Sequence, residues 1–94
     1  MNVRIVNRNT GTASVTTSAT GSEWVTLPAN RATEVDMPNY TGTDLEYRIG
    51  TGPAIRIFNS TGKFFKVNNN TSTAQVRRVD QSNTQVTIPF QFID

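Results

Sequence analysis

The sequence predicts an all-β domain of the sandwich or jelly-roll type, and three observations favour that class. No segment of ten or more residues combines apolar side chains at helical spacing with good helix formers. Val, Ile and Thr are abundant, whereas leucine occurs at Leu27 and Leu45 only. Turn signals rich in Gly, Pro, Asn and Ser recur about every eight to twelve residues. This rhythm is typical of sandwiches and barrels, here with about eight or nine short antiparallel strands.

Alternating apolar residues predict four strands, because residues two apart lie on one face of a strand. The alternating sets are Val3 and Ile5; Leu45, Tyr47 and Ile49; Ile55 and Ile57; and Val86, Ile88, Phe90 and Phe92. Weaker β patterns between the turns predict strands at 13–20, 23–27, 33–37, 63–68 and 74–79. Residues 10–22, rich in Thr, Ser, Ala and Gly, form either an edge strand or a mobile loop.

Three local features lead to predictions about strand pairing. The turn signal at 59–62 predicts a hairpin that brings Ile57 opposite Phe65 or Val67. Pro89 cannot donate a ladder hydrogen bond, which predicts that the last strand is an edge strand or contains a bulge. The apolar residues of the stretch 76–79 are three apart, so a bulge interrupts that strand or the strand ends there.

Length and composition restrict the chain to one domain, residues 1–94, and exclude several kinds of chemistry. A chain of 94 residues and 10.4 kDa supports one hydrophobic core. It contains no Cys and no His, which excludes Cys/His zinc sites, disulfides, thiol catalysis and His-based triads. The sequence therefore predicts no enzyme activity, no cofactor and no metal.

The net charge of +2 is too small to predict a polyanion partner. No apolar run has the length of a transmembrane helix or of the core of a secretion signal. We therefore expect a protein made in the cytoplasm without a membrane partner.

Two carboxylate pairs have the spacing of an acid–base pair on one strand face, Glu34 with Asp36 and Asp44 with Glu46. Both pairs alternate with apolar residues, as the solvent face of a half-buried strand does. The solvent-face interpretation is favoured over catalysis. Calcium binding is disfavoured because no loop has the dense Asp/Asn/Gly spacing of a calcium site.

The cations and aromatic residues suggest contact surfaces. The chain has seven arginines and two lysines, and arginine is favoured at interfaces. The charges are spread along the chain and offset by acids, so nucleic acid is an unlikely partner. Phe58 does not share a strand face with Ile55 and Ile57, and Phe64 does not share one with Phe65 and Val67. At each of these two strands we therefore expect one aromatic or apolar side chain to face outward or into an interface. Trp24 could form a sugar platform, but a buried Trp24 is the favoured interpretation.

Three segments resemble small β-structured virion proteins of tailed bacteriophages, of the head decoration or cement type. They are Val25-Thr26-Leu27-Pro28-Ala29, the stretch Glu34-Val35-Asp36-Met37-Pro38-Asn39-Tyr40-Thr41-Gly42, and the stretch Val76-Arg77-Arg78-Val79-Asp80-Gln81-Ser82-Asn83, which contains the pattern Arg-Arg-x-Asp-x-Ser. The resemblance lies in strand-and-turn style and in Thr/Asn richness, and it extends from Val25 to the C-terminus.

The resemblance implies a sandwich or jelly roll that assembles as a symmetric homo-oligomer, with a trimer favoured, in a virion built in the host cytoplasm. The implied partner is the major capsid protein, and the implied function is to stabilise the head at the junctions between capsid subunits. The expected interface residues are Arg77, Arg78 and Asp80 for polar contacts, and Phe58, Phe64, Phe90 and Phe92 for apolar contacts. We expect Arg77, Arg78 and Asp80 to form ion pairs within or between subunits.

Two alternative functions stay open. One is a tail- or fibre-associated module that binds host carbohydrate through Trp24 or Tyr40. The other, less favoured, is a barrel that binds single-stranded nucleic acid, suggested by Arg56 beside Phe58 and by the Lys-Phe-Phe-Lys stretch at 63–66.

Overall fold

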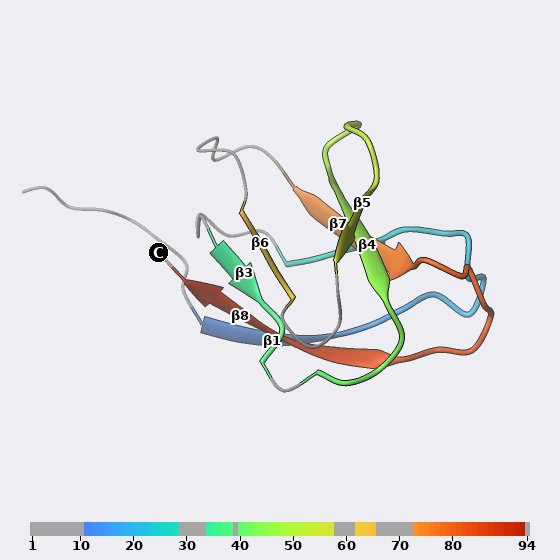
Figure 1. Cartoon of the computed structure of the whole chain (residues 1–94), viewed down its shortest axis with the longest axis horizontal. Helices are drawn as coiled ribbons and strands as arrows, with labels where there is room; N and C mark the ends of the chain where they lie inside the picture. Colours follow the sequence, from blue (N-terminus) through green and yellow to red (C-terminus); the bar gives the residue numbers. More distant parts are fainter. Residues whose placement is uncertain (1–10, 29–33, 39, 58–61, 66–72, 94) are drawn as a thin grey trace, which may run out of the picture.

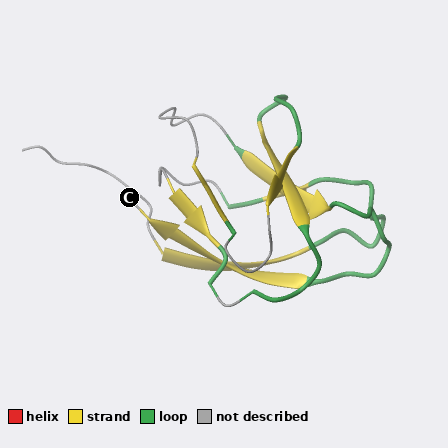
Figure 2. Cartoon of the chain, viewed as in Figure 1, coloured by secondary structure: helices red, strands yellow, loops and turns green. Residues whose placement is uncertain are grey.

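The computed structural model describes residues 11–28, 34–38, 40–57, 62–65 and 73–93, and these form two antiparallel sheets (Figure 1). The strands are β1 (Gly11–Thr16), β2 (Val25–Thr26), β3 (Glu34–Asp36), β4 (Leu45–Ile49), β5 (Ile55–Ile57), β6 (Lys63–Phe65), β7 (Ala74–Arg78) and β8 (Thr87–Ile93). Sheet A has the order β1-β8-β3-β6, and sheet B has the order β2-β7-β4-β5. The predicted all-β sandwich class is confirmed. Figure 2 shows strands and loops without a helix in the described residues, so none of these residues belongs to a helix that could cross a membrane.

The core lies between the sheets and is built by alternation. Along β8, Ile88, Phe90 and Phe92 are buried, while the residues between them are exposed. Sheet B contributes mainly Leu45 and Val76, both with no exposed surface. The alternation predicted for the last strand is confirmed.

Phe90 and Phe92 require a correction, because we predicted them as apolar contacts for a partner. Phe90 is 1% exposed and Phe92 is 6% exposed, so their side chains fill the sandwich and have little surface left for another molecule. The physical reason is that a strand in the middle of a sheet turns its whole apolar face toward the opposing sheet.

The predicted hairpin between β5 and β6 is wrong, because these strands belong to different sheets. Ile57 pairs with Leu45 of β4, whereas β6 pairs with β3 through Val35 opposite Phe64. A turn composition signals a change of direction but does not determine whether the chain returns to the same sheet. The predicted turn residues 58–61 lie outside the described residues.

The prediction that the last strand is an edge strand or contains a bulge is also wrong. The strand β8 lies between β1 and β3 (Figure 1), and its pairing with β1 is uninterrupted from Thr87 to Phe92. Pro89 nevertheless disrupts no ladder. It pairs with Ser14 of β1, whereas the pairing with β3 stops at Asp36 opposite Gln91. Pro89 therefore lies in the half of β8 that has one neighbouring strand.

The structure also shows where β1 lies in its sheet and where β7 ends. Of the two alternatives for residues 10–22, the edge strand is confirmed for Gly11–Thr16. The strand that contains Val76 ends at Arg78, and the Val79 N–H donates to the Asp44 carbonyl oxygen at 3.1 Å. The strand predicted around Val3 and Ile5 lies outside the described residues.

Candidate interaction surface

The outer face of sheet B carries a connected layer of polar and aromatic side chains, which we call the sheet B face. It follows from alternation: Leu45 and Val76 point into the core, so Glu46 and Arg77 point outward. Register then brings Glu46 between Arg77 of β7 and Arg56 of β5. The residues of the face are Trp24, Thr26, Asp44, Glu46, Arg48, Arg56, Gln75 and Arg77.

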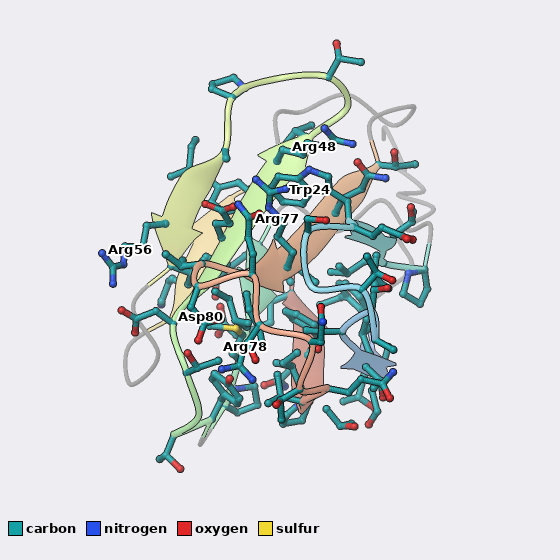
Figure 3. The ribbon with its side chains drawn as sticks, turned by 90° about the vertical axis from the view of Figure 1, so that its right-hand side faces the viewer. Trp24, Arg48, Arg56, Arg77, Arg78 and Asp80 are labelled. Atoms are coloured by element: carbon teal, nitrogen blue, oxygen red, sulfur yellow. The ribbon has the colours of Figure 1, made fainter. Side chains whose placement is uncertain are left out.

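Trp24 lies at the centre of two cation–π contacts. The guanidinium carbon of Arg77 lies 4.3 Å from the centroid of the Trp24 ring, and that of Arg48 lies 4.6 Å from it. Figure 3 shows Trp24 between the two arginines. Both distances fall within the roughly 6 Å range in which the ring quadrupole attracts a cation. The favoured interpretation of Trp24 as a buried residue is therefore wrong, because its half-buried indole forms one stacked unit with the two guanidinium groups on the surface.

Two arginines of this face, Arg56 and Arg77, are held in place by acidic partners. Arg77 Nε donates to Glu46 Oε2 at 2.6 Å, and Arg77 Nη1 donates to the Ser22 carbonyl oxygen at 2.8 Å. The Arg77 and Glu46 side chains are 19% and 16% exposed, so this pair is well shielded from solvent. Arg56 Nη2 donates to Asp44 Oδ2 at 2.6 Å. Charged side chains fixed in this way lose little conformational entropy when they contact another molecule.

A second row of hydrogen bonds crosses the same face. Arg48 Nε donates to Gln75 Oε1 at 2.6 Å, and Gln75 Nε2 donates to Thr26 Oγ1 at 3.0 Å. Three neighbouring strands are thereby linked by their outward side chains. Both carboxylates of the Asp44/Glu46 pair accept hydrogen bonds from arginine, which agrees with a solvent-face role for that pair.

Arg78 and Asp80 lie apart from the sheet B face, as Figure 3 shows. Arg78 pairs with Leu45, so it belongs to the inward-facing row, at the end of β7. Its side chain is 13% exposed and donates to both Asp80 carboxylate oxygens, at 2.8 and 2.7 Å, and to the Thr84 carbonyl oxygen at 2.9 Å. The hydrogen bond from Arg78 holds the pKa of Asp80 below its usual value.

The three predicted polar interface residues therefore separate. Arg77 lies on the sheet B face, whereas Arg78 lies in the inward-facing row at the end of β7 and is paired with the more exposed Asp80. Their ion pairs are formed within one chain, which is one of the two arrangements that the sequence predicted.

Tyr40 requires a correction as a possible carbohydrate contact. It is 7% exposed, and its hydroxyl donates to the Thr43 carbonyl oxygen at 2.8 Å. Burial raises the pKa of the Tyr40 phenol. A side chain enclosed in this way offers no platform for a sugar ring.

Two of the predicted contact residues fall outside what the structure describes. Phe58 lies in the segment 58–61, and the side chain of Phe64 is not among the described side chains. Conversely, the sequence reasoning missed Glu46, Arg48 and Gln75 as parts of a surface. Alternation within β4 places Glu46 and Arg48 on one face, but their partners on β7 follow only from the pairing of distant strands.

The Glu34/Asp36 pair lies on the outer face of sheet A. A hydrogen bond with the Asp36 side chain raises the pKa of Glu34, with smaller contributions from burial and from the Asp36 charge, while Lys63 opposes the change. Asp36 Oδ1 is enclosed and has no hydrogen-bond partner among the described residues. No group of three or more acidic side chains that could hold a metal ion occurs in the described residues.

We expect Glu34→Gln to stabilise the protein near neutral pH. The folded-state pKa of Glu34 lies above its ordinary value of 4.5, so stability is lost as the pH rises through the folded-state pKa. The variant avoids this loss, and its melting temperature should exceed that of the native sequence by a degree or two, on the order of a small surface effect. Thermal unfolding should show the difference vanishing near about pH 4, where the carboxyl is protonated. Equal melting temperatures near neutrality would contradict the prediction.

The chain matches no protein-family model, and the comparisons find neither a curated protein nor a solved structure similar to it.

Proposed function

We propose that this protein is a non-enzymatic structural component of a phage virion, of the capsid decoration type, and that it docks on the capsid through the sheet B face. The observation that carries this proposal is the stacked unit of Trp24 between Arg48 and Arg77, held by Glu46 and Gln75. The capsid as the partner follows from the resemblance of the sequence to small β-structured virion proteins of tailed bacteriophages.

The composition of the sheet B face supports docking on another protein. Tryptophan and arginine are the residues that most often dominate the binding energy of protein interfaces. Here their side chains are already ordered by ion pairs and hydrogen bonds, which reduces the entropic cost of binding. A rigid sandwich with such a face can contribute a modest binding energy at each of many capsid junctions, and the sum stabilises the shell.

The same contacts weigh against the carbohydrate alternative. A sugar ring stacks on an open face of an indole, but the Arg48 and Arg77 guanidinium groups lie over the Trp24 ring. Nucleic-acid binding is disfavoured because Glu46 and Asp44 offset the charges of Arg77 and Arg56 on this face.

Co-sedimentation with capsids of the phage that encodes the protein tests the proposal. We expect the native chain to sediment with heads, and heads that lack it to lose heat resistance. Trp24→Ala should weaken head binding by at least about tenfold, since it removes the centre of the stacked unit. Gln91→Ala is the matched control, because Gln91 is exposed on sheet A, away from the sheet B face.

Thermal unfolding of both variants should precede the binding assay, to establish that each is folded. A folded native chain with no affinity for heads would overturn the proposal. Head binding unchanged by Trp24→Ala would overturn the assignment of the sheet B face. Glycan-array binding that Trp24→Ala abolishes would favour the carbohydrate alternative instead.

A further inference from the structure

The two sheets have four edge strands, and three of them carry features that hinder pairing with another molecule. In the described residues, β2 is two residues long, β5 has Arg56 at its centre, and β6 begins with Lys63. Short length and charged side chains are common protection against edge-to-edge association. The fourth edge, β1, is six residues long, Gly-Thr-Ala-Ser-Val-Thr, without a charge or a proline. Among the described strands, this edge is therefore the one most open to pairing.

The hydrogen-bond pattern shows which backbone groups of β1 point to the open side. The Thr17 N–H donates to the Val86 carbonyl oxygen at 2.9 Å, so Thr17 directs its backbone groups toward the β8 side. In an antiparallel ladder this direction alternates from residue to residue. The N–H and C=O groups of Thr12, Ser14 and Thr16 consequently point away from β8. The pairing of Ser14 with Pro89 agrees, because Pro89 has no N–H to donate to Ser14.

We propose that β1 pairs antiparallel with β1 of a second copy of this chain, with a two-fold axis at Ser14. In this register Ser14 faces Ser14 of the second copy and Thr12 faces Thr16. The residues with outward backbone groups thus meet one another, and about six hydrogen bonds can form across the axis. The two copies of sheet A become one continuous sheet.

The choice of a second copy as the occupant follows from the self-complementary sequence around Ser14. In a two-fold contact each residue faces its symmetry-related position, and the order Thr-Ala-Ser-Val-Thr is nearly the same in both directions, so each side chain would face one of similar size and polarity. Ala13, half-buried, would pair with the buried Val15 of the other copy on the core side of the sheet. On the outer side, hydroxyl side chains would face hydroxyl side chains. No like charges oppose one another in this contact.

The proposed contact is independent of the sheet B face, because β1 belongs to sheet A. Its failure would leave the proposed docking on capsids untouched. Its symmetry gives a dimer, and this differs from the trimer that the resemblance implies.

Sedimentation equilibrium over a wide range of protein concentrations tests the dimer. We expect the native chain to reach the mass of two chains, and Ser14→Lys to raise the dissociation constant by at least about tenfold, because two lysines would oppose each other at the axis. Thr84→Lys adds the same charge at an exposed position in the loop before β8 and should leave the dimer intact. Circular dichroism confirms that both variants are folded.

Cysteine variants test the register, since the chain has no native cysteine. Under mild oxidation Ser14→Cys should form a disulfide-linked dimer, because residues facing each other in a hydrogen-bonded pair have Cα atoms about 5.5 Å apart. Thr12→Cys is the matched control on the same strand. Its two thiols would be displaced by four residues, about 13 Å along the strand, and should cross-link much more slowly.

A native chain that stays monomeric at every concentration would overturn the proposal and would leave the β1 edge for another occupant. A dimer that resists Ser14→Lys would also overturn it. Equal cross-linking of Ser14→Cys and Thr12→Cys would overturn the register.

Discussion

Phe90→Ala is expected to cost about 3–5 kcal/mol of the free energy of unfolding. Phe90 is 1% exposed and lies on β8, which has β1 and β3 as neighbours, so truncation leaves a cavity between the sheets. A domain of this length has a total stability of about 5–14 kcal/mol, so the loss is a large fraction of it. Urea unfolding should show a lower midpoint, and the melting temperature should fall by about 12 °C or more.

Gln91→Ala is the control for this experiment, because Gln91 is exposed on the same strand. It should change the free energy of unfolding by about 0.5 kcal/mol or less. An equally small effect of Phe90→Ala would contradict the position of Phe90 in the core and would restore it as a contact residue.

Gly21→Ala is expected to cost about 3 kcal/mol, the second large effect. A Cβ at residue 21 would meet the carbonyl oxygens of Gln81 and Ser82, and these are backbone atoms that cannot rotate away. The displacement would also weaken the hydrogen bond from the Gly21 N–H to Asn83 Oδ1, which is 3.0 Å long. Chemical unfolding measures the loss.

Two controls separate the contributions at Gly21. Asn83→Ala removes the hydrogen-bond acceptor without adding a Cβ at residue 21, and it should cost about 1 kcal/mol. Ser22→Ala changes an exposed neighbour and should be nearly neutral. A Gly21→Ala loss no larger than that of Asn83→Ala would contradict the close approach of the two loops.

The position of Gly21 also bears on the sheet B face. Ser22, the next residue, accepts a hydrogen bond from Arg77 through its carbonyl oxygen. A shift of this loop would move an anchor of the stacked unit around Trp24. Under the proposed function, Gly21→Ala should therefore weaken the binding to heads in addition to lowering stability.

The candidate surface could be predicted in part. Arg77 was identified from the sequence as a contact residue, and alternation along β4 places Glu46 and Arg48 outward. That these residues meet over Trp24 depends on β2, β7 and β4 being neighbours, and these strands are far apart in the sequence. Phe90 and Phe92 were predicted as apolar contact residues, but they fill the core because β8 is a central strand.

The sequence by itself determined the fold class, the faces of the strands and most strand positions, because period-two alternation and turn residues are local properties. Strands Leu45–Ile49 and Ile55–Ile57 have the predicted bounds. Only the tertiary structure decided which strands pair, and hence that β8 is central, that Arg78 lies in the inward-facing row and that β1 is an edge strand among the described residues. The physical reason is that sheet order depends on the packing of two apolar faces and on long-range loop closure, and no single segment carries that information.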